Sequence, residues 1–112
     1  MPHDLLSRAL HRRSLALVSL AEQADRRGDR GGARARYEEA ARLEEEEALA
    51  LPDRDPVVIT LLAMASLTLW IRAERWAEVE RASAAFLARP GLLTPDGRAS
   101  VESIVAAARI GA

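Results

Sequence analysis

The two histidines are the first side chains of this 112-residue chain to consider for chemistry, since imidazole serves as a general base and as a metal ligand. His3 and His11 lie eight positions apart in the sequence. On a helix this spacing places them roughly on one side but about 12 Å apart along the axis. They cannot share a metal ion or flank one nucleophile, and the chain has no cysteine to supply a thiolate. The histidines therefore predict neither a metal site nor a catalytic dyad.

The acidic run Glu44–Glu47 is the second candidate, because paired carboxylates carry general acid–base catalysis. Consecutive residues of a helix point in different directions, so these carboxylates cannot converge on one bond. A solvated helix face explains the run best, and an acidic docking patch is the alternative. The glycines of Gly28–Gly32 follow no strand and precede no lysine, so they predict a turn rather than a phosphate-binding loop. We therefore expect no enzyme activity and no cofactor.

The distribution of charge argues against a nucleic-acid partner. The net charge is −1, and the arginine-rich pieces Arg12–Arg13 and Arg26–Arg30 contain no aromatic residues. Residues 1–36 hold eight arginines and four acids (net +4), whereas residues 37–56 hold eight acids and two arginines (net −6). Antiparallel helices would bring these segments side by side, so we expect them to pair within the chain. All 16 basic residues are arginine, and lysine and asparagine are absent, as is typical of a GC-rich bacterial genome.

Breaker residues divide the chain into five predicted helices. The sequence is 49% apolar and 29% charged, as in a soluble globular protein, and it is rich in alanine, the strongest helix former. Gly28 supplies the left-handed residue that ends the first helix, whereas Asp55 and Thr94 are N-caps followed by proline. No segment has the pattern of a strand. We expect an all-α fold with helices over residues 4–27, 30–50, 56–73, 75–88 and 95–110.

The second and third of these helices differ in how they bury apolar surface. The third is unusual because Val57–Ile71 contains no charge, and a helix that is apolar on all sides either crosses a membrane or is buried on most faces. Fifteen residues span about 22 Å, less than a hydrocarbon core of ~30 Å, so we expect a buried central helix and no membrane association.

No secretory signal is evident at the N-terminus, so we expect a cytoplasmic protein. The predicted stripe of the second helix comprises Ala33, Tyr37, Ala40, Ala41, Leu43 or Glu44, Ala48 and Leu51.

Two helical hairpins with short turns resemble the tetratricopeptide repeat. In segment 14–47 the small and apolar residues of both helices stand at the spacing of that family, with Gly28–Asp29 at the turn. A second, degenerate copy covers residues 59–92, and residues 44–56 are inserted between the copies. The matching positions are Leu17, Leu20, Ala21, Ala24, Ala33, Tyr37, Ala40 and Leu43 in the first copy, and Leu67, Trp70, Trp76, Val79, Ser83 and Phe86 in the second.

The resemblance implies a single domain over residues 1–112, built as a right-handed superhelix of about five antiparallel helices. Hairpin one would cover about 4–50, hairpin two about 56–89, and a closing helix about 95–110. In the family the inner groove commonly binds a peptide or helix of another protein. An apolar groove favours an amphipathic helix as ligand. The residues that the resemblance places in the groove are Leu15, Val18, Glu22, Asp25, Arg26, Leu61, Met64, Thr68, Ile71 and Arg72.

Two functional interpretations follow from the sequence. The favoured one is an adaptor or chaperone-like module that binds another protein. The alternative is a structural homo-oligomer, such as a homodimer, in which a second copy covers the apolar helix 56–73, since two hairpins are few for a repeat protein. Trp70 and Trp76 belong either to the core or to the surface that binds a partner.

Overall fold

Five helices make up the computed structural model, which describes the backbone of residues 3–50 and 55–111 and the side chains of residues 11–50 and 55–110. No strand occurs in these ranges, so the prediction of an all-α fold is confirmed. Leu51, predicted to end the apolar stripe of the second helix, lies outside the described residues. The helices are α1 (His3–Arg26), α2 (Arg30–Ala50), α3 (Pro56–Arg72), α4 (Trp76–Leu87) and α5 (Pro95–Gly111).

The predicted caps account for where the helices begin and end. The Asp55 carboxylate accepts a hydrogen bond from the Val57 amide at 2.9 Å, and the Thr94 hydroxyl accepts one from the Gly97 amide at 3.0 Å. Each cap satisfies an amide of the first turn that has no partner within the helix. Gly28 ends α1 with φ at 80°, a conformation that glycine adopts without steric cost. The helix boundaries predicted at these three residues are therefore confirmed.

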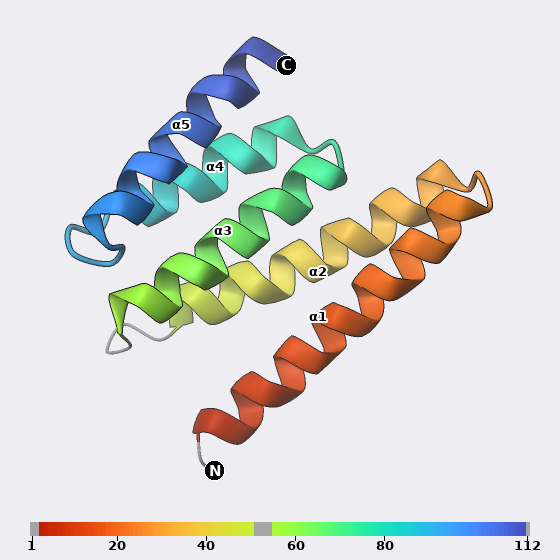
Figure 1. Ribbon diagram of the computed structural model, residues 1–112, viewed down its shortest axis with the longest axis horizontal. Helices are drawn as coiled ribbons and strands as arrows, with labels where there is room; N and C mark the ends of the chain where they lie inside the picture. Colours follow the sequence, from red (N-terminus) through yellow and green to blue (C-terminus); the bar gives the residue numbers. More distant parts are fainter. Residues whose placement is uncertain (1–2, 51–54, 112) are drawn as a thin grey trace.

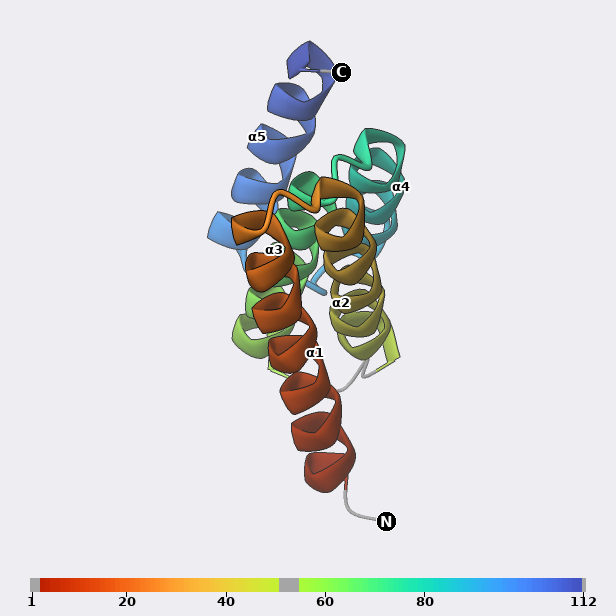
Figure 2. The ribbon, with the colours of Figure 1, turned by 90° about the vertical axis from the view of Figure 1, so that its right-hand side faces the viewer.

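The helices form a slab two helices thick, with principal extents of 41, 40 and 17 Å. Figures 1 and 2 show α1, α3 and α5 in one layer and α2 and α4 in the other, with consecutive helices antiparallel. Helix α2 packs against both α1 and α3, and α3 packs against α4 and α5. Helices α1 and α3 therefore run in the same direction, with α2 behind and between them.

Residue size divides the core into two parts. Between α1 and α2 the buried residues are small, among them Ala21, Ala24, Ala33 and Ala40, which allow the two backbones to approach closely. Elsewhere in the core the fully buried residues are larger and include Trp70 of α3, Phe86 of α4 and Val101 of α5. The two tryptophans differ, since Trp70 is fully buried in the core whereas Trp76 is half-buried against it.

Helix α3 is less buried than the sequence predicts. Val57, Val58 and Leu61 are 54%, 37% and 66% exposed, although Ile59, Leu67 and Trp70 are buried. In a two-layer slab α3 contacts α2 and α4 behind it and α5 beside it, so its front face is uncovered. The interpretation of α3 as a buried central helix therefore holds for its contacts with α2, α4 and α5 and fails in its first two turns, where Val57, Val58 and Leu61 are exposed. Among the described residues no helix is long and apolar enough to cross a membrane.

The prediction of a solvated acidic face on α2 is wrong. Glu44, Glu45 and Glu47 are only 4%, 8% and 5% exposed, and Glu46 alone of the run is exposed. The reason is that α2 lies between α1 and α3 and also faces α4, so most of its circumference is covered.

Ion pairs within the chain do connect the basic and acidic segments, as expected from their charges. Arg13 of α1 contacts Glu39 of α2 at 3.1 Å. The acidic segment also pairs with arginines that follow it, since Glu38 lies 3.5 Å from Arg75 and Glu45 lies 2.8 Å from Arg81. The charge asymmetry therefore reflects contacts of α2 on two sides and not with α1 alone.

Candidate functional site

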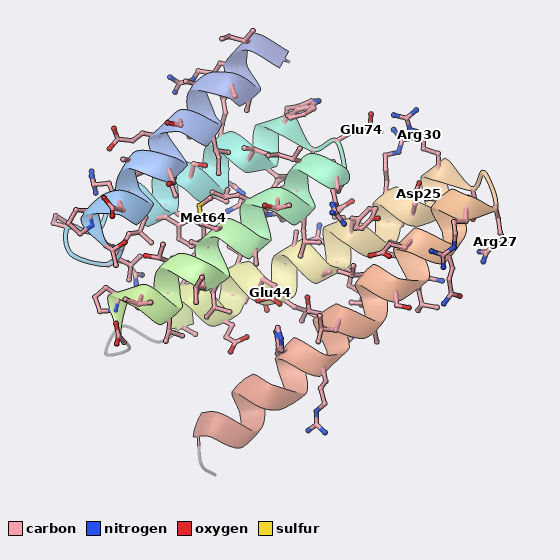
Figure 3. All side chains as sticks on the ribbon, in the orientation of Figure 1. Asp25, Arg27, Arg30, Glu44, Met64 and Glu74 are labelled. Atoms are coloured by element: carbon pink, nitrogen blue, oxygen red, sulfur yellow. The ribbon has the colours of Figure 1, made fainter. Side chains whose placement is uncertain are left out.

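A groove of about 370 Å³ lies between α1 and α3 and is floored by α2. We call it the α1–α3 groove. Its walls are largely apolar, and α2 contributes a single lining residue, Glu44, seen between the two front helices in Figure 3. The lining consists of His11, Ser14, Leu15 and Val18 from α1, Glu44 from α2, and Met64, Ala65, Thr68, Leu69 and Arg72 from α3.

The structure brings part of the predicted groove set together here. Five members of the predicted set line the α1–α3 groove, namely Leu15, Val18, Met64, Thr68 and Arg72. Of these, Met64 places its sulfur on the side of α3 that faces α5 (Figure 3). Asp25 lines a separate polar pocket, and Ile71 packs against the core. Glu22, Arg26 and Leu61 are exposed outside both sites.

The floor residue Glu44 has an incomplete set of polar contacts. Its Oε1 lies 3.4 Å from Nδ1 of His11, an imidazole whose side chain is 57% exposed. Its Oε2 is buried and has no hydrogen-bond partner among the described residues. The sequence contained a signal for this position, because Glu44 continues the stripe of Ala40 and Ala48 at four-residue steps.

Ser14, His11 and Glu44 are residue types that can form a nucleophile, a base and an orienting carboxylate. Ser14 is only 2% exposed, and in the part of the chain that the structure describes no hydrogen bond joins it to His11. Within the same residues no group of three histidine, aspartate or glutamate side chains could hold a metal ion.

A polar pocket of about 420 Å³ continues from one end of the α1–α3 groove, and Arg72 lines both. The Arg72 guanidinium lies 5.7 Å from the centre of the Tyr37 ring, and the Tyr37 hydroxyl donates to Asp25 at 3.4 Å. Asp25 and Arg72 are the only residues of the predicted groove set that line this pocket. The remaining lining residues are Gly28, Arg30, Ala33, Arg34, Tyr37 and Glu74.

Glu74 closes the polar pocket from the turn between α3 and α4. It adopts φ of 58°, in the left-handed region that favours glycine. Its carboxylate accepts hydrogen bonds from Arg30 at 2.7 and 3.3 Å and from Arg34 at 3.2 Å. These contacts join α2 to the turn and offset the unfavourable backbone conformation.

The Arg30 hydrogen bond, together with the charges of Arg30 and Arg34, lowers the pKa of Glu74 below its ordinary value of 4.5. A carboxyl group with a lowered folded-state pKa stabilises the fold above its unfolded pKa, and this contribution is lost as pH falls through the folded value. We expect Glu74→Gln to melt at a lower temperature than the parent near pH 7 and by a smaller margin near pH 3. Thermal unfolding at both pH values checks this, and an equal difference at both would contradict it.

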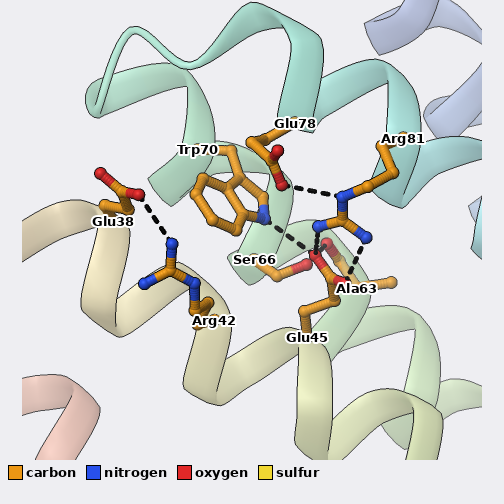
Figure 4. Close-up of polar contacts among 8 residues, drawn as sticks. All are labelled: Glu38, Arg42, Glu45, Ala63, Ser66, Trp70, Glu78 and Arg81. Carbon is orange, nitrogen blue, oxygen red and sulfur yellow. Dashed lines mark hydrogen bonds and ion pairs between the residues drawn. The ribbon is translucent and has the colours of Figure 1, made fainter.

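A polar network centred on the buried carboxylate of Glu45 links α2, α3 and α4 (Figure 4). Arg81 donates to both oxygens of Glu45 at 2.8 and 2.9 Å, and the Trp70 indole nitrogen donates to Oε1 at 2.9 Å. The hydrogen bond to Glu45 raises the pKa of Arg81, so the guanidinium stays charged. Glu45 therefore has partners on both oxygens, unlike its neighbour Glu44.

Comparisons with protein-family profiles, with curated proteins and with solved structures found no match to this chain. The candidate site is therefore interpreted from its own geometry and chemistry.

Proposed function

We propose that this chain is a non-catalytic protein-interaction module, adaptor or chaperone-like, of the tetratricopeptide-like helical type. Its α1–α3 groove binds an amphipathic helix of another protein. The observation that carries the proposal is an apolar groove between two helices of one layer, with Leu15 in its wall 55% exposed. The repeat-like spacing of small residues in α1 and α2 and the alternation of helices between two layers support the superhelical arrangement.

A helix is the ligand that such a groove fits best. Apolar residues at three- and four-residue steps form one stripe along a helix, and a stripe can lie between Leu15 and Val18 on one wall and Ala65 and Leu69 on the other. Burying an exposed leucine against such a stripe contributes roughly 1.5–3 kcal/mol. A helix satisfies its own backbone hydrogen bonds, whereas an extended peptide would bring unpaired backbone groups into a largely apolar groove.

Leu15→Ser tests the groove directly. We expect the variant to bind helical peptides roughly 10- to 100-fold more weakly, which corresponds to the apolar contact that is lost. Its free energy of unfolding should change by less than about 1 kcal/mol, because Leu15 is already largely exposed. The probe is a phage-displayed library of helical peptides of about 18 residues, long enough to be helical alone. Fluorescence anisotropy of the selected peptides gives the affinities.

Leu20→Ser is the matched control, since Leu20 also lies on α1, is 44% exposed and does not line the groove. Affinity close to that of the parent is expected for this variant. Selected peptides that bind the two serine variants equally well would place the binding surface elsewhere and contradict the proposed function.

The alternative is a homodimer in which a second copy covers the front of α3. The exposed side chains of Val57, Val58 and Leu61 are the observation that favours it. Sedimentation equilibrium separates the two interpretations. A monomer at tens of micromolar excludes the dimer, whereas a dimer that Leu61→Asp dissociates would replace the proposed function.

A further inference from the structure

Glu44 and Glu45 are adjacent buried carboxylates, but only Glu45 has hydrogen-bond partners on both of its oxygens. They are 4% and 8% exposed. Both oxygens of Glu45 accept hydrogen bonds from Arg81, and Trp70 donates a third. Glu44 Oε2 accepts none from the described residues, and His11 Nδ1 lies 3.4 Å from Oε1, beyond the usual hydrogen-bond distance of about 2.7–3.2 Å. The unsatisfied carboxylate is the one at the floor of the groove.

Leaving a buried carboxylate oxygen without a partner is unfavourable, because the charge has lost water and gained nothing in return. Among the described residues, the cationic or ionisable side chains that line the groove, His11 and Arg72, do not provide the missing partner. His11 is mostly exposed and reaches only the other oxygen, and the Arg72 guanidinium lies over the Tyr37 ring. A cation carried by a ligand in the groove can supply the missing positive charge.

We propose that the helix bound in the α1–α3 groove carries one lysine or arginine on its apolar face, and that this cation pairs with Glu44. The inference rests on the proposed function and specifies the chemistry of the partner. The aliphatic stem of such a side chain can pass between Leu15 and Leu69 while its charged head reaches the carboxylate. In an apolar groove the attraction is stronger than at an open surface.

Glu44 also confers specificity under this proposal. A fully apolar helix would cover the carboxylate and leave it unpaired, and an acidic side chain at the same place would be repelled. The partner is thereby restricted to amphipathic helices that interrupt their apolar stripe with a single basic residue.

The test selects peptides from the displayed helical library on the parent protein and, in parallel, on Glu44→Gln. We expect peptides selected on the parent to carry lysine or arginine at one fixed position between apolar residues. Those selected on Glu44→Gln should keep the apolar residues and lose the basic one. Glu46→Gln, at an exposed position of the same helix, should select the same peptides as the parent. Circular dichroism confirms that each variant is folded.

A binding cycle makes the result quantitative. Replacing the basic residue of a selected peptide by methionine should weaken binding to the parent by at least about 30-fold, as for other buried charge pairs. The same change should alter binding to Glu44→Gln by less than about threefold. Equal effects on both proteins, or groove-binding peptides with no basic residue, would overturn this inference and leave the proposed function standing. Peptides indifferent to Leu15→Ser would overturn the proposed function itself.

Discussion

Trp70→Ala is expected to lower the free energy of unfolding by about 3–5 kcal/mol, the usual cost of emptying a buried aromatic site. Trp70 is fully buried and is the largest of the fully buried side chains. It packs between α2 and α4 and donates its indole N–H to Glu45. The substitution leaves a cavity and removes one donor from a buried carboxylate. Since domains of this size are stable by roughly 5–15 kcal/mol, the variant should be close to unfolding at 37 °C.

Two further substitutions test this prediction, one at the same site and one at the other tryptophan. Trp70→Phe keeps most of the apolar volume and loses the N–H, so we expect a smaller loss of about 1–2 kcal/mol. Trp76→Ala, at a half-buried position, should cost less than Trp70→Ala. Urea unfolding followed by far-UV circular dichroism gives the three values. Equal losses for Trp70→Ala and Trp76→Ala would show that the core is not centred on Trp70.

The helix boundaries were predictable because each depends on local chemistry. Asp55, Thr94 and Gly28 act through their own side chain or backbone on residues two or three positions away, so no tertiary information is needed. The burial of α2 and α3 was predicted less well. Burial depends on which helices pack against each one. Helix α2 packs against α1 and α3, and α3 packs against α2, α4 and α5 but leaves Val57, Val58 and Leu61 exposed. The hydrophobicity of a helix alone does not show which other helices pack against it.

The candidate site was predictable only where the resemblance to the tetratricopeptide repeat places residues in the groove. Leu15 and Val18, and likewise Thr68 and Arg72, share a helix face at three- or four-residue spacing, and each pair lines the groove. Glu44 was predicted only as an alternative to Leu43 in the stripe of the second helix. The burial of Glu45 was missed because charged residues are ordinarily exposed, and its partners Trp70 and Arg81 lie 25 and 36 positions away in the sequence. The polar pocket was missed for the same reason, since Arg30 and Glu74 are 44 positions apart.

Arg81→Met is expected to lower the free energy of unfolding by about 3 kcal/mol, the second largest effect predicted here. Arg81 supplies both charged hydrogen bonds of the Glu45 carboxylate, a side chain that is only 10% exposed. Its removal leaves a buried negative charge with the Trp70 indole as its one remaining partner among the described residues. Glu78, the other partner of Arg81, is more exposed and can be solvated.

The partner substitution Glu45→Met should cost less, about 2 kcal/mol, because the pair is asymmetric in its exposure. The Arg81 side chain is 49% exposed, so water can solvate its charge once Glu45 is gone, and the main loss is the acceptor of the Trp70 N–H. The double variant should be less destabilised than the sum of the two, since two apolar side chains leave no buried charge. Urea unfolding of the three variants provides this double-mutant cycle. If Glu45→Met proved the more damaging single change, or if the two effects simply added, the network would not owe its stability to neutralising the Glu45 carboxylate.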